Sequence, residues 1–223
     1  MCFSANASFG TGIALSIIGV VALKKTHLSS QIPFAAIPLI FSIQQLAEGC
    51  LWLMLRNSNF LVAEHAITYI FLFFAQIIWP VWVPISFLIL EKKKSRTNLQ
   101  KLLVGIGVLV SSYLGYCLIA FPVQARIVEH HITYDQAYPH ALSNYVALFY
   151  LIATIAPPFF SHVKKMPLLG IAILMSYAIT TFFYDDYLIS VWCFFASVIS
   201  IAVYAIIVEM DKAKPRIVLN KIV

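Results

Sequence analysis

One carboxylate, Glu48, lies deep inside an apolar run and is the first residue that points to chemistry. Placing an ionised carboxylate in hydrocarbon costs at least a few kcal/mol, so the side chain must face protein, find a polar partner or take up a proton. Gln44, Gln45 and Trp52 fall within about 60° of Glu48 on a helix that turns about 100° per residue. This stripe predicts either a functional site within the membrane or a hub of hydrogen bonds between helices.

A second stripe occupies one helical face of the third apolar run and contains His65, Tyr69, Leu72, Gln76 and Trp79. A Glu48–His65 pair could move a proton or bind a divalent metal ion. Two ligands are fewer than the three or four that a metal site needs, so a hydrogen-bonded histidine without metal is the competing interpretation.

The segment Trp79-Pro80-Val81-Trp82-Val83-Pro84 places two prolines inside this same run. Each proline removes a backbone hydrogen bond and kinks a helix, and hydrocarbon offers no water to the freed carbonyl groups. We expect a bend that fits the helix around its neighbours, or one that lines a protein-buried cavity. Trp79, Pro80 and Pro84 therefore receive structural roles.

Trp192 and Cys193 of the seventh apolar run are expected near Glu48, and small hydroxylated residues on the face of this run predict close helix packing. Ser8, Gly12 and Ser16 predict the same for the first run, because small residues recur there every four positions. The outer half of the bundle is thus expected to hold a polar pocket, with these candidate ligand-binding residues: Gln45, Glu48, Trp52, His65, Tyr69, Gln76, Trp192 and Cys193.

Membrane helices must position these residues, because 61% of the 223 residues are hydrophobic and only 11% are charged. A spanning helix needs about 20 apolar residues. The sequence predicts an all-α integral membrane bundle of seven transmembrane helices in a single domain, with residues 209–223 as a basic cytoplasmic tail. The predicted spans are 7–23, 33–55, 61–90, 102–121, 141–160, 168–183 and 188–208.

The basic residues set the expected orientation. Every Lys and Arg except Arg56 and Arg126 lies in alternate connections or in the C-terminal tail. Because cytoplasmic loops carry an excess of Lys and Arg, this pattern places the N-terminus outside and the C-terminus in the cytoplasm. The basic inner face would lie against anionic lipid headgroups.

The net charge of +6 does not predict a nucleic-acid partner, since the charges form short clusters between apolar runs. The four cysteines form no CxxC pair and no zinc-ligand spacing. All lie towards the predicted outer half, where disulfides can form, and the sequence leaves their pairing open. They are Cys2, Cys50, Cys117 and Cys193.

The opening Met1-Cys2-Phe3-Ser4-Ala5 resembles an uncharacterised family of bacterial multi-pass membrane proteins. The likeness extends over nearly the whole chain, through Gln44-Gln45 with Glu48-Gly49, the Trp79–Pro84 segment and Val191-Trp192-Cys193. The resemblance implies a multi-pass fold in a bacterial plasma or inner membrane and implies no activity. It adds Cys2 to the residues of structural interest.

Three functions compete. The first is ligand binding, as a sensor or transport-associated protein, with a small molecule or a lipid in the outer pocket. The second is a metal-dependent intramembrane hydrolase acting on lipid, with Glu48 as general base or ligand and His65 as ligand; no HxxxH or HExxH pair supports it. The third is a structural or assembly partner in a membrane complex. We favour ligand binding over an enzyme.

Overall fold

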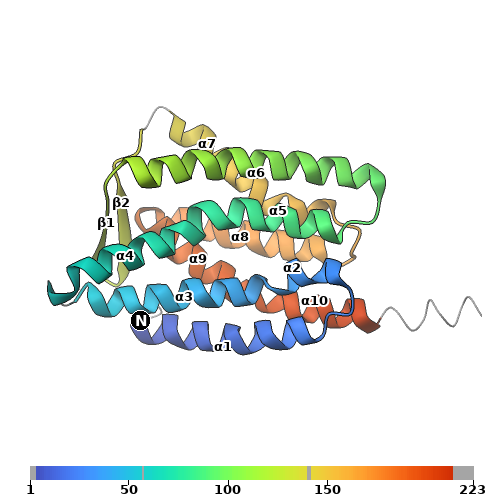
Figure 1. Ribbon diagram of the computed structural model, residues 1–223, viewed down its shortest axis with the longest axis horizontal. Helices are drawn as coiled ribbons and strands as arrows, with labels where there is room; N and C mark the ends of the chain where they lie inside the picture. Colours follow the sequence, from blue (N-terminus) through green and yellow to red (C-terminus); the bar gives the residue numbers. More distant parts are fainter. Residues whose placement is uncertain (1–3, 57, 140–141, 213–223) are drawn as a thin grey trace, which may run out of the picture.

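A computed structural model describes residues 4–56, 58–139 and 142–212 and shows an elongated helical bundle (Figure 1). Six helical stretches are long and apolar enough to cross a membrane. A shorter apolar helix lies at the position of the fifth predicted span. The first helix starts at one end of the bundle and the last ends at the other. The membrane-length stretches are Ala5–Lys24, Ser29–Met54, Leu61–Leu90, Arg96–Ala120, Met166–Phe183 and Asp185–Asp211.

We call the six membrane-length stretches and the shorter apolar helix rods, numbered one to seven in chain order. The first two rods pack tightly through small residues. Helix α1 (Ala5–Lys24) lies along α3 (Ile37–Met54), which follows the 3₁₀ turn η1 (Ser29–Gln31) and the short helix α2 (Ile32–Ala35). The hydroxyls of Ser16 and Ser42 are 2.5 Å apart. A Cβ added to Gly12 would meet Leu46 at 2.9 Å, so this glycine permits the close approach that the small-residue spacing predicts.

The third rod changes helical geometry in its middle. After the 3₁₀ turn η2 (Ser58–Phe60), α4 (Leu61–Leu72) passes into a π-helical segment, η3 (Phe73–Ile78), and then into α5 (Trp79–Leu90). The π-helical turn directly precedes Pro80, which cannot donate a backbone hydrogen bond. The bend predicted around Trp79 and Pro80 therefore takes the form of a wider helical turn.

The fourth rod, α6 (Lys94–Ala120), begins eight residues before the predicted start of its span. Polar residues 94–101, assigned above to a connection, instead form the first turns of this helix. A hairpin of β1 (Val123–Val128) and β2 (His131–Gln136) follows, and the sequence analysis did not predict it. Its antiparallel register pairs Val128 with His131, and Glu129 in the turn has a φ of 53°.

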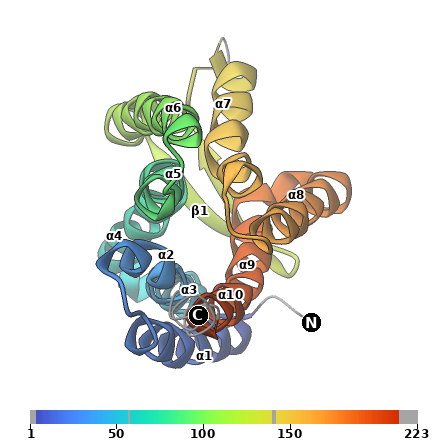
Figure 2. The ribbon, with the colours of Figure 1, turned by 90° about the vertical axis from the view of Figure 1, so that its right-hand side faces the viewer.

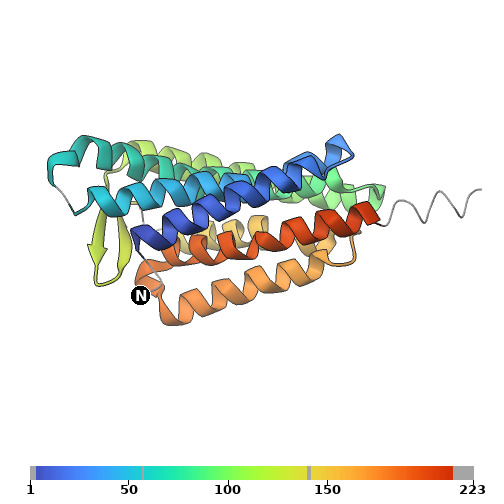
Figure 3. The same ribbon diagram turned by 90° about the horizontal axis from the view of Figure 1, so that it is seen from below.

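The last three rods complete the bundle (Figure 2). Helix α7 (Ser143–Ile155) continues into the 3₁₀ turn η5 (Pro157–Phe160) and is followed by α8 (Met166–Phe183). The turn η6 (Asp185–Tyr187) leads into α9 (Leu188–Ile199) and α10 (Ile201–Lys212). At 13 residues, α7 is about 20 Å long, well short of a hydrocarbon core of about 30 Å. Figure 3 shows α10 running beside α1.

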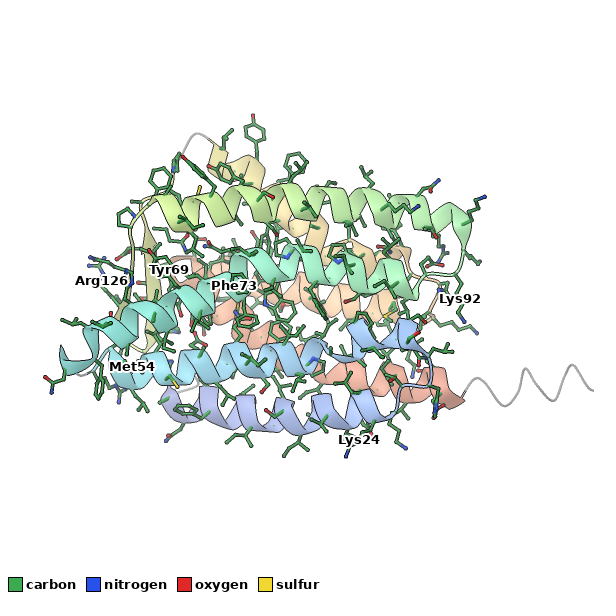
Figure 4. All side chains as sticks on the ribbon, viewed as in Figure 1. Lys24, Met54, Tyr69, Phe73, Lys92 and Arg126 are labelled. Atoms are coloured by element: carbon green, nitrogen blue, oxygen red, sulfur yellow. The ribbon has the colours of Figure 1, made fainter. Side chains whose placement is uncertain are left out.

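The two ends of the bundle differ in charge. Lys24 and Lys92 lie at one end and Arg126 at the other (Figure 4). Lys164 and Lys165 precede the start of α8, and both line the same pocket as Lys92. The basic clusters thus meet at one end, as the alternation of charged connections requires. The orientation across a membrane stays a prediction.

Candidate functional site

The polar stripe of α3 faces the interior of the bundle. Gln44 and Gln45 are fully buried and Glu48 is 2% exposed. The Ser190 hydroxyl of α9 donates a hydrogen bond to Glu48 Oε1 at 2.5 Å, and the Gln45 side chain lies beside the same carboxyl group. The Trp79 indole N–H of α5 donates to Gln44 Oε1 at 2.7 Å. The stripe therefore ties α3 to α5 and α9.

The β-hairpin covers the end of this cluster. Ile132 is fully buried and packs with Leu51 and Trp52. The Tyr134 ring stacks on Phe71, with centroids 4.9 Å apart and planes 6° from parallel. Burial, followed by the Glu48 carboxyl, raises the pKa of Tyr134 well above its usual value, so the phenol stays neutral. Glu48 and Trp52 thus lie beneath packed side chains, and neither lines any of the three cavities described below.

The stripe predicted on the third rod divides at the π-helical segment. His65 is exposed and its ring packs 4.6 Å from that of the half-buried Tyr69, whereas Gln76 and Trp79 are buried. A π-helical turn shifts every later side chain around the axis, so a constant 100° step fails beyond it. The structure brings Trp79 to Gln44 and leaves His65 outside the Glu48 cluster.

No group of three or more His, Cys, Asp or Glu side chains that could hold a metal ion occurs among residues 4–56, 58–139 and 142–212. The metal hypothesis for Glu48 and His65, and the hydrolase hypothesis that depends on it, gain no support from this geometry. Cys50, Cys117 and Cys193 carry free thiols, and Cys2 lies outside the described residues.

A cavity of about 210 Å³ lies between the π-helical segment, α6, α7 and α9. Three predicted pocket residues line it: Gln76, Trp192 and Cys193. Gln45, Glu48, Trp52, His65 and Tyr69 are not among its lining residues. The remaining lining residues are chiefly aromatic or apolar: Ala75, Tyr113, Leu114, Tyr138, Pro139, Val146, Ala147, Tyr150, Leu151, Tyr177, Leu188 and Ile189.

Two carbonyl groups of the π-helical segment accept hydrogen bonds from neighbouring helices. The Tyr150 hydroxyl of α7 donates to the Ala75 carbonyl at 2.5 Å, and the Ser111 hydroxyl of α6 donates to the Ile77 carbonyl at 2.8 Å. The Tyr138 hydroxyl donates to Gln76 Oε1 at 3.0 Å. The bend therefore both fits the helix to its neighbours, through these hydrogen bonds, and lines a cavity.

Trp192 has a polar group without a partner. Its indole Nε1 is buried and makes no hydrogen bond within the part of the chain that the structure describes. Its ring meets those of Tyr150 and Tyr177 edge-on, at centroid distances of 5.8 and 5.2 Å. A smaller cavity of about 70 Å³ shares Tyr150, Trp192 and Cys193 with the larger one and is bounded further along by Phe87 and Leu169. The indole therefore stands where two cavities meet.

Sequence reasoning did not identify Tyr138 or Tyr150. Tyr138 follows a hairpin whose strands alternate in exposure, and the alternation in Val123–Val128 could have revealed β1. Nothing in the apolar sequence around Tyr150 distinguishes a residue that bonds a freed carbonyl from one that faces lipid.

No curated protein and no solved structure matches this chain. A family model described as a family of unknown function, DUF6629, matches residues 1–217. This agrees with the uncharacterised family expected from the sequence, and the match carries no information about a bacterial origin or about the N-terminal signature. The chain belongs to the family of unknown function DUF6629.

Proposed function

We propose that this chain is a multi-pass membrane protein that binds an apolar or amphipathic molecule, such as a lipid chain, in the cavity beside Trp192. The proposal rests on one observation: a cavity of about 210 Å³ is lined by Trp192, whose buried indole N–H has no acceptor among the described residues. An apolar cavity of about 150 Å³ in a protein core stays dry and takes up small apolar molecules. An apolar ligand with an ester, carbonyl or carboxyl oxygen would fill the cavity and accept a hydrogen bond from the Trp192 indole N–H.

Access from the bilayer supports this choice of ligand. Ala147 of α7 lines the cavity and is itself exposed. Its neighbours Tyr145, Leu148 and Phe149 are 64%, 53% and 44% exposed, which makes this surface apolar. Such a face suits lipid, and a molecule dissolved in the bilayer could enter along α7. Entry from the bilayer is favoured over a pocket that opens to water. It suits a sensor or a transport-associated protein in a plasma or inner membrane.

The test uses doxyl-labelled stearic acid, whose nitroxide quenches tryptophan fluorescence at short range. We expect saturable quenching of the purified protein in detergent, with a large part of it lost in Trp192→Phe. Ala147→Phe should fill the cavity mouth and weaken binding at least tenfold. Ala178→Phe is the matched control, because Ala178 is exposed on α8 and lines no cavity that the structure shows. Quenching that rises without saturation, or equally in both variants, would refute a defined site.

For the cluster around Glu48 we propose a structural role. Its carboxyl group is enclosed, bonded to Ser190 and separate from the cavities, so its geometry suits a link between α3 and α9. Interhelical hydrogen bonds of this kind contribute about 0.6–2 kcal/mol in membranes.

A further inference from the structure

A third pocket, of about 370 Å³, lies at the lysine-rich end of the bundle, away from the two cavities beside Trp192. It is formed where the connection before α2, the end of α5, the loop before α8 and helix α10 meet. Its lining residues are Leu28, Ser30, Gln31, Leu90, Lys92, His162, Val163, Lys164, Lys165, Ile206, Glu209 and Met210.

The rim of this pocket has an excess of positive charge. It carries three lysines and one acid, Glu209, and that acid is already engaged by Lys165 Nζ at 2.7 Å. Lys92 and Lys164 are exposed and make no ion pair with any residue that the structure describes. Two cationic groups therefore face the pocket without a counter-charge of their own.

Glu91 fixes the geometry of the rim. Its side chain is fully buried, and its Oε1 accepts hydrogen bonds from the backbone N–H groups of Lys92 and Lys93 at 3.0 and 2.8 Å. Its Oε2 accepts one from the His162 backbone N–H at 3.1 Å. Burial alone would raise the pKa of Glu91, but these N–H groups and the adjacent His162 ring hold it below its usual value. The carboxylate thus fastens the loop before α6 to the loop before α8.

Apolar side chains form the remaining wall. Leu28, Leu90, Val163, Ile206 and Met210 line the same pocket, and Leu90 is the last residue of α5. The pocket therefore combines a cationic rim with an apolar wall at the end of a membrane-length helix. Helix α8 starts at Met166, so the positive end of its dipole adds to the field at this rim.

We propose that this pocket binds a phosphate group, with Lys92 and Lys164 as its main cationic contacts. Basic pockets between helices at the cytoplasmic face hold the headgroups of anionic lipids in this way. The apolar wall favours the phosphate of an anionic phospholipid, whose glycerol and first methylene groups would lie over Leu90 and Val163. A soluble phosphate would use the same lysines without that wall.

The test measures lipid binding to the full-length protein in detergent by native mass spectrometry, with dioctanoyl phosphatidylglycerol and dioctanoyl phosphatidylcholine as probes. A lysine near a membrane surface contributes about fivefold to the affinity for an anionic lipid. Lys92→Gln with Lys164→Gln should therefore weaken phosphatidylglycerol binding about thirtyfold and leave phosphatidylcholine unchanged. Glu209→Gln frees Lys165 and should strengthen phosphatidylglycerol binding, a gain that misfolding cannot imitate.

The matched control is Lys24→Gln with Lys25→Gln, which removes the same charge from the same end of the bundle outside the pocket. Affinity within twofold of the wild type in this control, together with the loss at Lys92 and Lys164, supports the site. Equal losses in the two double variants would show only a diffuse surface charge and would overturn the proposal. Inorganic phosphate provides the second arm: competition at millimolar concentration assigns the site to a soluble phosphate, and its failure to compete assigns the site to the lipid headgroup.

Discussion

Replacing Gly107 with alanine should separate the fourth rod from the bend of the third. A Cβ at this position would overlap the carbonyl oxygen of Pro80 and lie 2.8 Å from its carbon, whereas ordinary van der Waals contact begins near 3.4 Å. The contact with the carbon alone requires α5 and α6 to move apart by about 0.6 Å. Both atoms belong to the backbone of Pro80, so no side-chain rotation can relieve the overlap.

The energetic cost follows from three contributions. Overpacking of this kind costs about 1–3 kcal/mol. The hydrogen bond from Ser111 to the Ile77 carbonyl lies one helical turn further along α6, and separation would stretch it from 2.8 Å to at least about 3.4 Å, losing most of its roughly 0.6 kcal/mol. The better helix propensity of alanine returns at most about 1 kcal/mol. The net destabilisation should be about 1–3 kcal/mol.

Gly105→Ala provides the matched control on the same helix. A Cβ added to Gly105 meets no atom within 4 Å, so only the gain in helix propensity remains and stability should rise slightly. Unfolding of both variants in mixed detergent micelles with increasing dodecyl sulfate, followed by circular dichroism, measures the difference. Equal stabilities for the two variants would show that α6 does not pack against the Pro80 carbonyl as described.

Three further predictions, at Glu48, Tyr150 and His131, test the polar contacts. Glu48→Gln keeps an acceptor for Ser190 and should change the free energy of unfolding by less than about 1 kcal/mol, whereas Glu48→Leu leaves that hydroxyl unpaired and should cost about 1–3 kcal/mol in the same assay. Tyr150→Phe leaves the Ala75 carbonyl without its donor and should cost about 0.6–2 kcal/mol, measured likewise. Burial lowers the pKa of His131 below 6.5; the nearby Glu129 carboxylate opposes this shift, and the nearby His130 adds to it. Protonation of His131 therefore favours the state in which the hairpin has separated from the bundle. The protection factors of the β1 and β2 amides in hydrogen exchange, which are corrected for the intrinsic exchange rate at each pH, should therefore fall as the pH falls from about 7.5 to 5.5, and His131→Gln should remove this dependence.

The sequence predicted the elements that obey regular periodicity. Gln44, Gln45 and Glu48 lie on one face of a single unbroken helix that turns about 100° per residue. Because the Glu48 carboxyl group must face protein, the two glutamines on the same face must do so too. The close packing of α1 on α3 follows likewise from small residues at a spacing of four. Both inferences needed only neighbours along one helix.

The rest of the site depends on events that change the period. The π-helical segment rotates Gln76 and Trp79 away from the face of His65. The residue types in Phe73–Ile78 do not predict a π-helical turn. The hairpin lies in what looked like an unstructured connection, yet it covers Glu48 and supplies Tyr134. Three of the eight predicted lining residues, Gln45, Glu48 and Trp52, are therefore buried among packed side chains, and three others, Gln76, Trp192 and Cys193, line the cavity.

The position of the cavity follows from which side chains satisfy the bend. Ser111 is short, so α6 must approach the Ile77 carbonyl closely, and Gly107 one turn away allows its backbone to do so. Tyr150 reaches the Ala75 carbonyl across the length of a phenol ring, so α7 can satisfy the same bend from further away. The longer reach of Tyr150 leaves space beside α7, and this space extends to Tyr113 and Leu114 of α6. The short helix α7 thus reaches the bend through the long Tyr150 side chain, and this arrangement is the basis of the proposed entry of a ligand along α7.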